Sequence, residues 1–213
     1  MKFDDLLSKL GKQPFFDLPS VVQLTDEPRK SVQVQLYRWC NAGKLIPLRR
    51  GMYCFAEPYA SQSINGAQLA NHIYRPSYLS TFWALGYYGL IPEKVVTFTS
   101  VSSRVTRKFE NALGLFTYRH LKADAFWGYG RLEIGGRRVL IAEPEKALLD
   151  LWYLENGPWT PERMDGMRFQ NMEQVDDSLL QAYGERLESL RILSAIDEWR
   201  LAREREEKGT VEL

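Results

Sequence analysis

The stretch that decides the fold covers residues 28–55 and reads PRKSVQVQLYRWCNAGKLIPLRRGMYCF. Its first half predicts a helix from about Pro28 to Ala42, because apolar residues recur at helical spacing and Gly43 follows as a residue that ends helices. Leu36 marks the centre of the face predicted to be buried. The opposite face is predicted to point to solvent, and it carries Lys30, Val34, Tyr37, Arg38 and Asn41.

The second half predicts a β-hairpin, with strands over 44–48 and 52–55 joined by a turn at 49–51. Two shorter helices are predicted upstream, one ended by Gly11 and one capped by Asp17. Three helices followed by a hairpin with a basic tip are the layout of a winged helix-turn-helix. Residues 1–58 are therefore predicted to form such a domain.

The chemistry of this stretch favours DNA as its partner. A helix that enters the major groove needs polar and basic side chains on the face away from its own core. The start of a helix favours phosphate, and a basic hairpin tip can reach the DNA backbone or the minor groove. Protein contact with a merely solvated basic face is the alternative. The candidate DNA-binding residues are Arg29, Lys30, Ser31, Gln33, Tyr37, Arg38, Arg49 and Arg50.

Composition is that of an ordinary globular protein, with 45% hydrophobic and 26% charged residues in a chain of 213. The formal net charge of +1 divides into +3 over residues 1–60, +3 over 61–161 and −5 over 162–213. A mildly basic front suits a phosphate-facing N-terminus. Cys40 and Cys54 are too few for a disulfide framework, so we expect reduced, mostly buried thiols. Without a signal peptide or an apolar span, we expect a cytoplasmic protein with no membrane contact.

Residues 59–213 predict a mixed α/β domain with a helical tail, which makes the whole chain α+β. Glu57 to Ser63 is predicted to be a linker. From residue 178 to residue 207, apolar side chains recur every three or four residues. This spacing indicates one long helix, or two helices with a break at Gly184. Helices are predicted over 64–73, 81–88 (capped by Ser80) and 144–154, and strands over 95–99, 114–121, 131–134 and 138–142.

Enzyme chemistry finds little support in these residues. A restriction-type nuclease needs Glu-x-Lys on a strand, whereas Glu145 and Lys146 are adjacent on a predicted helix, where an ion pair with Asp150 is the simpler role. His120 is predicted to be a half-buried strand residue rather than part of a nucleophilic triad. No phosphate-binding Gly-x-x-x-x-Gly-Lys-Ser/Thr sequence occurs. We therefore expect a protein that is not an enzyme and that needs no cofactor and no metal.

Several segments together resemble the AbiEi family of transcriptional regulators. Residues 43–53 are similar to that family's wing, and 80–92 to its serine-to-Ala-Leu helix that ends in Gly-Leu-Ile-Pro. Residues 97–100 and 116–121 resemble two of its strands, and 142–150 its Glu-Lys-Ala-Leu-x-Asp helix. These segments keep the family's order over roughly residues 15–155. The tail after Trp159 matches loosely.

The resemblance implies two roles. The winged helix would bind inverted repeats in its own promoter, as an autorepressor. Residues 59–213 would act as the antitoxin to a co-encoded nucleotidyltransferase toxin, in a type IV toxin–antitoxin system, with direct binding of the toxin left open. The alternatives are a stand-alone regulator and a protein-interaction module. For such a module, Trp152, Trp159 and Trp199 are candidates for a groove, though core positions fit their spacing better, and Glu204 to Glu207 could imitate nucleic-acid charge.

Overall fold

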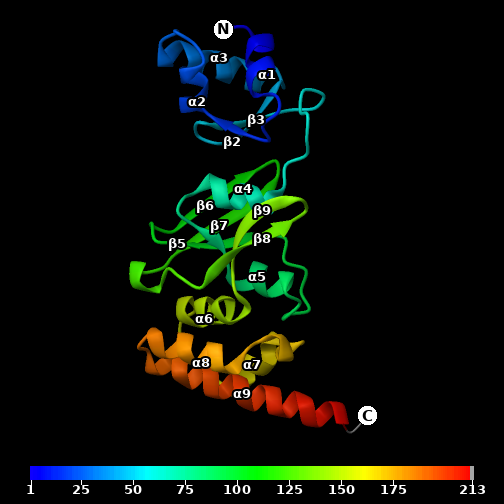
Figure 1. Cartoon of the computed structure of the whole chain (residues 1–213), viewed down its shortest axis with the longest axis vertical. Helices are drawn as coiled ribbons and strands as arrows, with labels where there is room; N and C mark the ends of the chain where they lie inside the picture. Colours follow the sequence, from blue (N-terminus) through cyan, green and yellow to red (C-terminus); the bar gives the residue numbers. More distant parts are fainter. Residues whose placement is uncertain (212–213) are drawn as a thin grey trace.

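The chain folds into three tiers stacked along its long axis, with the two ends of the chain at opposite ends of the molecule (Figure 1). The structure, a computed structural model, describes the backbone of residues 1–211 and the side chains of residues 1–206. Both helices and sheets are present, so the α+β class is confirmed. Among the described residues, no helix has an apolar stretch long enough to cross a bilayer.

The first tier contains three helices and a small antiparallel sheet with strand order β1-β3-β2. The predicted helices and hairpin are confirmed, while the two-residue strand β1 was not predicted. Gly43 takes a φ of +68° just past α3, as its place at the predicted helix end requires. In chain order the elements are α1 (Phe3–Leu10), β1 (Phe16–Asp17), α2 (Leu18–Gln23), α3 (Arg29–Asn41), β2 (Leu45–Arg49) and β3 (Met52–Phe55).

A core of its own holds this tier together. Val32 and Leu36 of α3 are completely buried against α1 and the sheet. The Phe3 ring meets the edge of the Trp39 ring at a centroid distance of 5.5 Å. Asp17 caps α2 as predicted, because its side chain accepts a hydrogen bond from the Ser20 amide at 3.0 Å. Burial of one face of α3 fixes which of its side chains remain in solvent.

The middle tier is a six-stranded mixed sheet with strand order β6-β7-β5-β4-β9-β8. β5 runs parallel to β7, and β4 parallel to β9, while the other neighbours are antiparallel. The predicted strand over 95–99 begins three residues later, and β4 and β6 were not predicted. The strands are β4 (Tyr78–Leu79), β5 (Phe98–Ser102), β6 (Arg107–Asn111), β7 (Gly114–His120), β8 (Tyr129–Ile134) and β9 (Arg137–Ala142).

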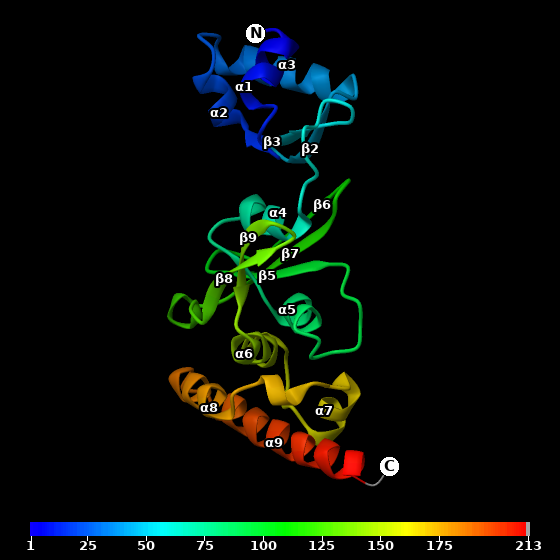
Figure 2. The ribbon, with the colours of Figure 1, turned by 45° about the vertical axis from the view of Figure 1, so that its right-hand side comes forward.

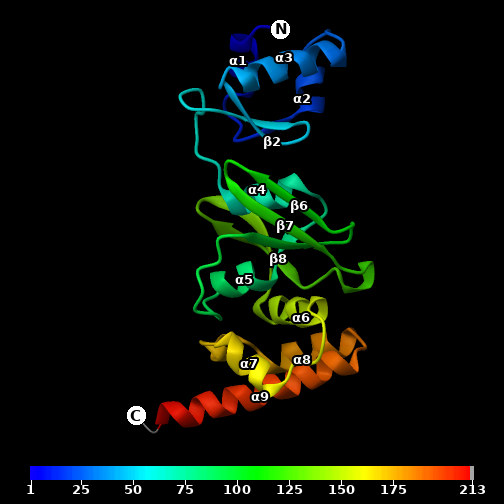
Figure 3. The ribbon, with the colours of Figure 1, turned by 180° about the vertical axis from the view of Figure 1, so that it is seen from behind.

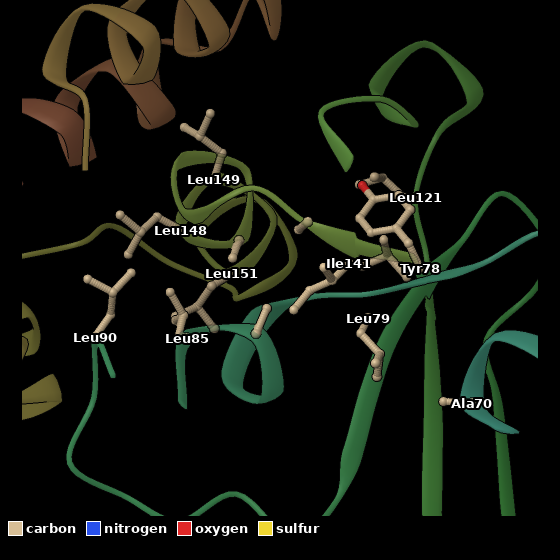
Figure 4. Close-up of a cluster of buried hydrophobic side chains, with 14 of the residues drawn as sticks. Ala70, Tyr78, Leu79, Leu85, Leu90, Leu121, Ile141, Leu148, Leu149 and Leu151 are labelled. Carbon is tan, nitrogen blue, oxygen red and sulfur yellow. The ribbon is translucent and has the colours of Figure 1, made fainter. Parts of the chain in front are cut away.

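Helices cover both faces of this sheet. α4 (Gly66–Ile73) lies on the side of the first tier, whereas α5 (Thr81–Tyr87) and α6 (Pro144–Leu154) lie on the other side (Figure 3). Figure 4 shows the apolar core between the sheet and α5 and α6, to which Leu85, Leu148 and Leu151 contribute. The predicted bounds of α6 are confirmed, because Pro144 is favoured at a helix start and the apolar spacing continues to Leu154.

Ser80 does not cap α5 in the predicted way. It occupies the N-cap position, but its side chain makes no capping hydrogen bond. The Ser80 hydroxyl instead donates to Asp150 of α6 at 2.7 Å. The prediction of a serine cap was wrong because a buried carboxylate, which is distant in sequence, is a stronger acceptor for this hydroxyl.

The third tier consists of α7 (Pro161–Met167), α8 (Asp177–Arg186) and α9 (Leu190–Val211), packed beneath α6. The helical tail breaks at residues 187–189 and not at the predicted Gly184. Gly184 lies inside α8, where a Cβ atom would collide with the Ile196 side chain of α9. The two helices approach closely at this glycine, and a larger residue would force the Ile196 side chain to move; the sequence pattern did not reveal this packing role.

Arg191 joins the third tier to the second. Its guanidinium donates to the carbonyl oxygens of Trp152 and Glu155 at 2.8 Å and of Tyr153 at 2.9 Å, which are the free carbonyls at the end of α6. The predicted core role of the three tryptophans is confirmed, since Trp152, Trp159 and Trp199 are at most 4% exposed. Of the acidic stretch 204–207, the side chain of Glu207 lies outside the described residues.

The hairpin of the first tier also packs on the second tier. Leu48, Met52 and Cys54 belong to the same buried cluster as the sheet of the second tier. Asn111 at the end of β6 donates a hydrogen bond from Nδ2 to the Leu48 carbonyl at 2.9 Å. Figure 2 shows β6 at the edge of the second tier that lies nearest the hairpin. The hairpin therefore lies between α3 and the large sheet.

Candidate nucleic-acid interface

The face of α3 that points away from its core is exposed along the helix. Val34 is 49% exposed and Tyr37 66%, both unusual for side chains of this size. Val32 and Leu36, on the opposite face, are fully buried, so the register of the helix is fixed. All predicted site residues of α3 are exposed to solvent, and they are Arg29, Lys30, Ser31, Gln33, Tyr37 and Arg38.

The cations of this face are not neutralised within the described part of the chain. Arg29, Lys30 and Arg38 form no ion pair there, and no acidic residue occurs in α3. The nearest acid in sequence, Glu27, already pairs with the N-terminal ammonium group of Met1 and accepts a hydrogen bond from Gln35. The positive potential of α3 is therefore directed outward, towards whatever approaches the face.

The beginning of α3 is open as well. Pro28 occupies the N-cap position and supplies no capping side chain. The amides of Ser31 and Val32 bond to the Pro28 carbonyl at 2.8 and 3.2 Å, which leaves the amides of Arg29 and Lys30 outside the helical pattern. Free amides, the helix dipole and two cationic side chains together favour an anion at this end.

The two arginines of the hairpin turn lie apart from this group. Arg50 is exposed, whereas Arg49 is half-buried, and one of its Nη atoms donates to the Arg50 carbonyl at 3.1 Å. Arg49 Nε is buried without a hydrogen-bond partner. Both arginines line a cavity between the first and second tiers to which α3 contributes no residue. Six of the eight predicted residues are thus exposed on α3, and the other two lie at the tier junction.

This junction cavity has a volume of about 770 Å³ and is strongly basic. Asp17 is the sole carboxylate among its lining residues. Arg104 stacks over the Tyr74 ring at 4.6 Å, and its guanidinium donates to the Arg75 carbonyl at 3.2 Å. The cations that line the cavity are Arg49, Arg50, Arg75, Arg104, Arg107 and Lys108.

Sequence reasoning missed the four cations that the second tier contributes here. Arg107 and Lys108 belong to β6, a short charged edge strand without the apolar alternation that identifies strands. Arg75 and Arg104 lie in loops. Arg104, Arg107 and Lys108 lie within five residues of one another, but only the folded chain brings them together with Arg75 and the two arginines of the hairpin turn.

The other charged candidates of the sequence form a closed network inside the second tier. Lys146 and Asp150 of α6 form an ion pair, as predicted, with side chains at most 1% exposed. Tyr78 donates a hydrogen bond to Asp150 at 3.0 Å, and Lys146 donates one to Tyr78 at 3.0 Å. Burial raises the pKa of Asp150 and lowers that of Lys146, while their mutual attraction opposes both shifts. These groups satisfy one another, and solvent does not reach them.

The two histidines lie apart. His120 is exposed, with Nδ1 at 3.1 Å from the Arg104 carbonyl, so the prediction of a half-buried residue was wrong. It lies at the last position of β7, next to the exposed Arg119. His72 is half-buried, and its Nδ1 lies 2.8 Å from the Gln68 carbonyl. Among the described residues, no cluster of three or more His, Cys, Asp or Glu side chains could hold a metal ion.

No protein-family model matches the chain. A search of curated proteins gave no match either. The geometry described above is therefore the basis for interpreting the function.

Proposed function

We propose that this chain binds duplex DNA through the exposed face of α3, with residues 1–58 acting as a winged helix-turn-helix. The observation that carries the proposal is a solvent-facing row of basic and polar side chains that have no acidic partner within the described chain. The order α1-β1-α2-α3-β2-β3, with a hairpin directly after the third helix, supports the same interpretation.

Two kinds of contact are proposed for this face. Lys30, Gln33, Tyr37 and Arg38 point away from the core of the tier and are suited to reach base edges in the major groove. Arg29, with the free amides at the beginning of α3, is suited to hold a phosphate, and Ser31 belongs to the same turn. Phosphate contacts position the protein on DNA, while base contacts select the sequence.

The hairpin has a smaller place in the proposal. Arg50 is exposed and free to reach a phosphate. Arg49 is half-buried at the tier junction, so a contact from its guanidinium would require the side chain to rearrange. We therefore assign most of the DNA affinity to α3 and a supporting role to Arg50.

A gel-shift titration with DNA from upstream of the chain's own gene tests this proposal. Arg38→Ala should weaken binding by about 1–3 kcal/mol and change the preferred sequence if the side chain contacts a base edge. Arg186→Ala, in which an exposed arginine of the third tier is removed, is the matched control and should bind as the unchanged chain does. An absent shift, or equal binding by both variants, would contradict the proposal.

Autorepression at inverted repeats and an antitoxin role are proposed from the sequence resemblance. The second and third tiers would then act against a co-encoded nucleotidyltransferase toxin, while α3 would act on the promoter. A full-length Arg29→Gln/Lys30→Gln/Arg38→Gln variant separates the two roles. It should lose repression yet still restore growth in cells that express the toxin. Failure of the unchanged chain to restore growth would favour a stand-alone regulator.

A further inference from the structure

A second cavity, of about 440 Å³, opens in the middle tier where β4 leaves the sheet. β4 is only two residues long, and it pairs with β9 through Leu79 and Ile141 alone. Further along β9, the side chain of Asn71 takes the place of a strand: its Oδ1 accepts from the Leu140 amide at 2.6 Å and its Nδ2 donates to the Leu140 carbonyl at 3.0 Å. Because a side chain and not a strand pairs with β9 at this point, space is left between β9 and residues 75–77.

Three guanidinium groups surround this space. Arg75 follows α4, Arg131 belongs to β8 and Arg138 to β9, and all three are exposed lining residues. Within the described chain, none of their side chains forms an ion pair or a hydrogen bond, and no carboxylate lines the cavity. Glu133 lies opposite Arg138 in the hairpin register without forming an ion pair. Like charges gathered without a counter-charge favour an anionic ligand.

A buried hydroxyl at the cavity points to a ligand independently. Ser77 lines the cavity and is only 4% exposed, yet its Oγ atom has no hydrogen-bond partner. Buried polar groups in native proteins are nearly always hydrogen-bonded. Rotation about one side-chain bond would let this hydroxyl donate to a group held in the cavity.

The wall of the cavity includes two aromatic rings. Phe126 and Tyr129 line it, with their ring centroids 5.4 Å apart. The Tyr129 ring is held in place because it stacks on the buried Tyr78 ring at 4.3 Å and an interplanar angle of 16°. Fixed aromatic side chains next to arginines suit a ligand that has a flat ring and a negative charge.

We propose that this cavity binds a nucleoside phosphate, with the phosphate held by Arg75, Arg131 and Arg138 and the base lying against Phe126 and Tyr129. The cavity volume is within the range of about 300–1,000 Å³ found for small-molecule sites. This activity goes beyond DNA binding and uses no residue of α3. A phosphate of DNA would offer the arginines the same chemistry, so the experiment has to distinguish the two sources.

Isothermal titration calorimetry of the full-length chain makes that distinction. The probes are AMP, GMP, CMP and UMP, the four parent nucleosides, inorganic phosphate and a 20-base-pair duplex. One monophosphate should bind at one site per chain, at least about tenfold more tightly than its nucleoside or inorganic phosphate. The proposal is overturned if no monophosphate binds, if phosphate alone binds equally well, or if the duplex displaces the monophosphate from these arginines.

Variants locate the site. Arg131→Gln/Arg138→Gln should weaken binding of the best monophosphate at least about 30-fold, since the variant removes hydrogen bonds from charged groups to the phosphate. Arg29→Gln/Arg38→Gln removes the same charge from α3 and should leave this binding within about twofold, while DNA binding falls. Equal weakening by both double variants would show a mere charge effect and would overturn the assignment.

Ser77→Ala supplies a readout that does not depend on charge. Because the hydroxyl has no partner in the structure, its removal should leave the melting temperature unchanged or raise it. Binding of the monophosphate should nevertheless weaken about tenfold, since the hydroxyl would donate to the phosphate. Unchanged binding by a folded Ser77→Ala chain would remove the hydroxyl from the proposed site.

Discussion

Helices α3 and α6 both carry lysines, yet the structure treats their charges in opposite ways. Lys146 of α6 is completely buried and bonded to Asp150 and Tyr78. Lys30 of α3 is exposed and has no partner within the described chain, as is the case for Arg29 and Arg38. A charge that is satisfied inside the protein contributes to the fold, and one that is left without a partner is available to another molecule.

The buried charges of α6 and the exposed charges of α3 each carry a free-energy cost. Removing a charge from water is unfavourable unless a partner compensates for it, and the α6 network therefore depends on every member being present. The exposed cations of α3 cost little in water, but they repel one another and give nothing to stability. The comparison teaches that substitutions in α6 should change folding, whereas substitutions in α3 should change only binding.

Loss of Asp150 should have the largest effect. Asp150→Ala leaves Lys146 buried without its counter-ion and leaves the Tyr78 and Ser80 hydroxyls without their acceptor. We expect the free energy of unfolding to fall by about 3–5 kcal/mol, measured by urea denaturation.

Asp165→Ala provides the matched control for this change. Asp165 is an exposed carboxylate that pairs with Arg205 at 2.9 Å, so its removal should cost less than about 1 kcal/mol. Similar losses in the two variants would mean that burial does not distinguish the α6 network.

A smaller effect is expected at Gly128, which packs directly on the aliphatic part of Lys146. Its φ is +69°, and a Cβ atom would lie 2.9 Å from Cγ of Lys146. Gly136 has a similar φ of +71° but open space where a Cβ would lie. Gly128→Ala should therefore destabilise the chain by about 1–3 kcal/mol more than Gly136→Ala in thermal or urea unfolding. Equal losses would show that backbone strain alone accounts for both.

The smallest expected effect concerns His72, which packs against Phe15 across the tier junction at a ring distance of 4.9 Å. Burial lowers the pKa of His72, and the charge of Arg75 lowers it further, while the hydrogen bond to the Gln68 carbonyl opposes the shift. The unfolded chain, with an ordinary histidine pKa of about 6.5, then takes up a proton that the folded chain resists. The free energy of unfolding should decline as the pH falls from 7.5 to 5.

His72→Gln should reduce this decline, which urea denaturation at several pH values would measure. His120→Gln, which changes the exposed histidine of β7, is the control and should leave the decline as it is. If both variants follow the pH profile of the unchanged chain, His72 does not couple protonation to folding.

Local sequence signals predicted the helices well and the short strands poorly. α6 was predicted with its observed bounds because a proline start and a regular apolar spacing act within one segment. β4 has only two residues and is defined by its partners β5 and β9, which lie farther along the chain. β6 pairs with β7 directly after it, but it is a charged edge strand without the apolar alternation of a strand. The break before α9 was assigned to Gly184 on propensity, whereas packing against Ile196 keeps that glycine inside a helix.

The candidate DNA site divides in the same way. Helical spacing alone placed Lys30, Tyr37 and Arg38 on the outer face of α3, and burial of Val32 and Leu36 agrees with that register. The spacing could not show that the hairpin turn would lie against β6, since that contact joins residues 63 positions apart. The arginines of the two cavities are brought together by the fold and by no local pattern.

A control that removes the same number of charges is needed for the central test, because net charge by itself affects DNA affinity. Lys94→Gln/Lys122→Gln/Arg186→Gln removes three exposed cations of the second and third tiers. This variant should retain nearly all of the affinity for DNA and the salt dependence of the unchanged chain.

The most direct test measures how DNA affinity depends on salt for the unchanged chain, this control and Arg29→Gln/Lys30→Gln/Arg38→Gln. Fluorescence anisotropy with a promoter duplex gives the slope of log Kobs against log salt, which changes by about 0.9 for each phosphate that the protein no longer neutralises. We predict that the α3 variant binds much more weakly, with a slope shallower by about 1–3. An α3 variant with the affinity and slope of the control would contradict the assignment of DNA binding to α3.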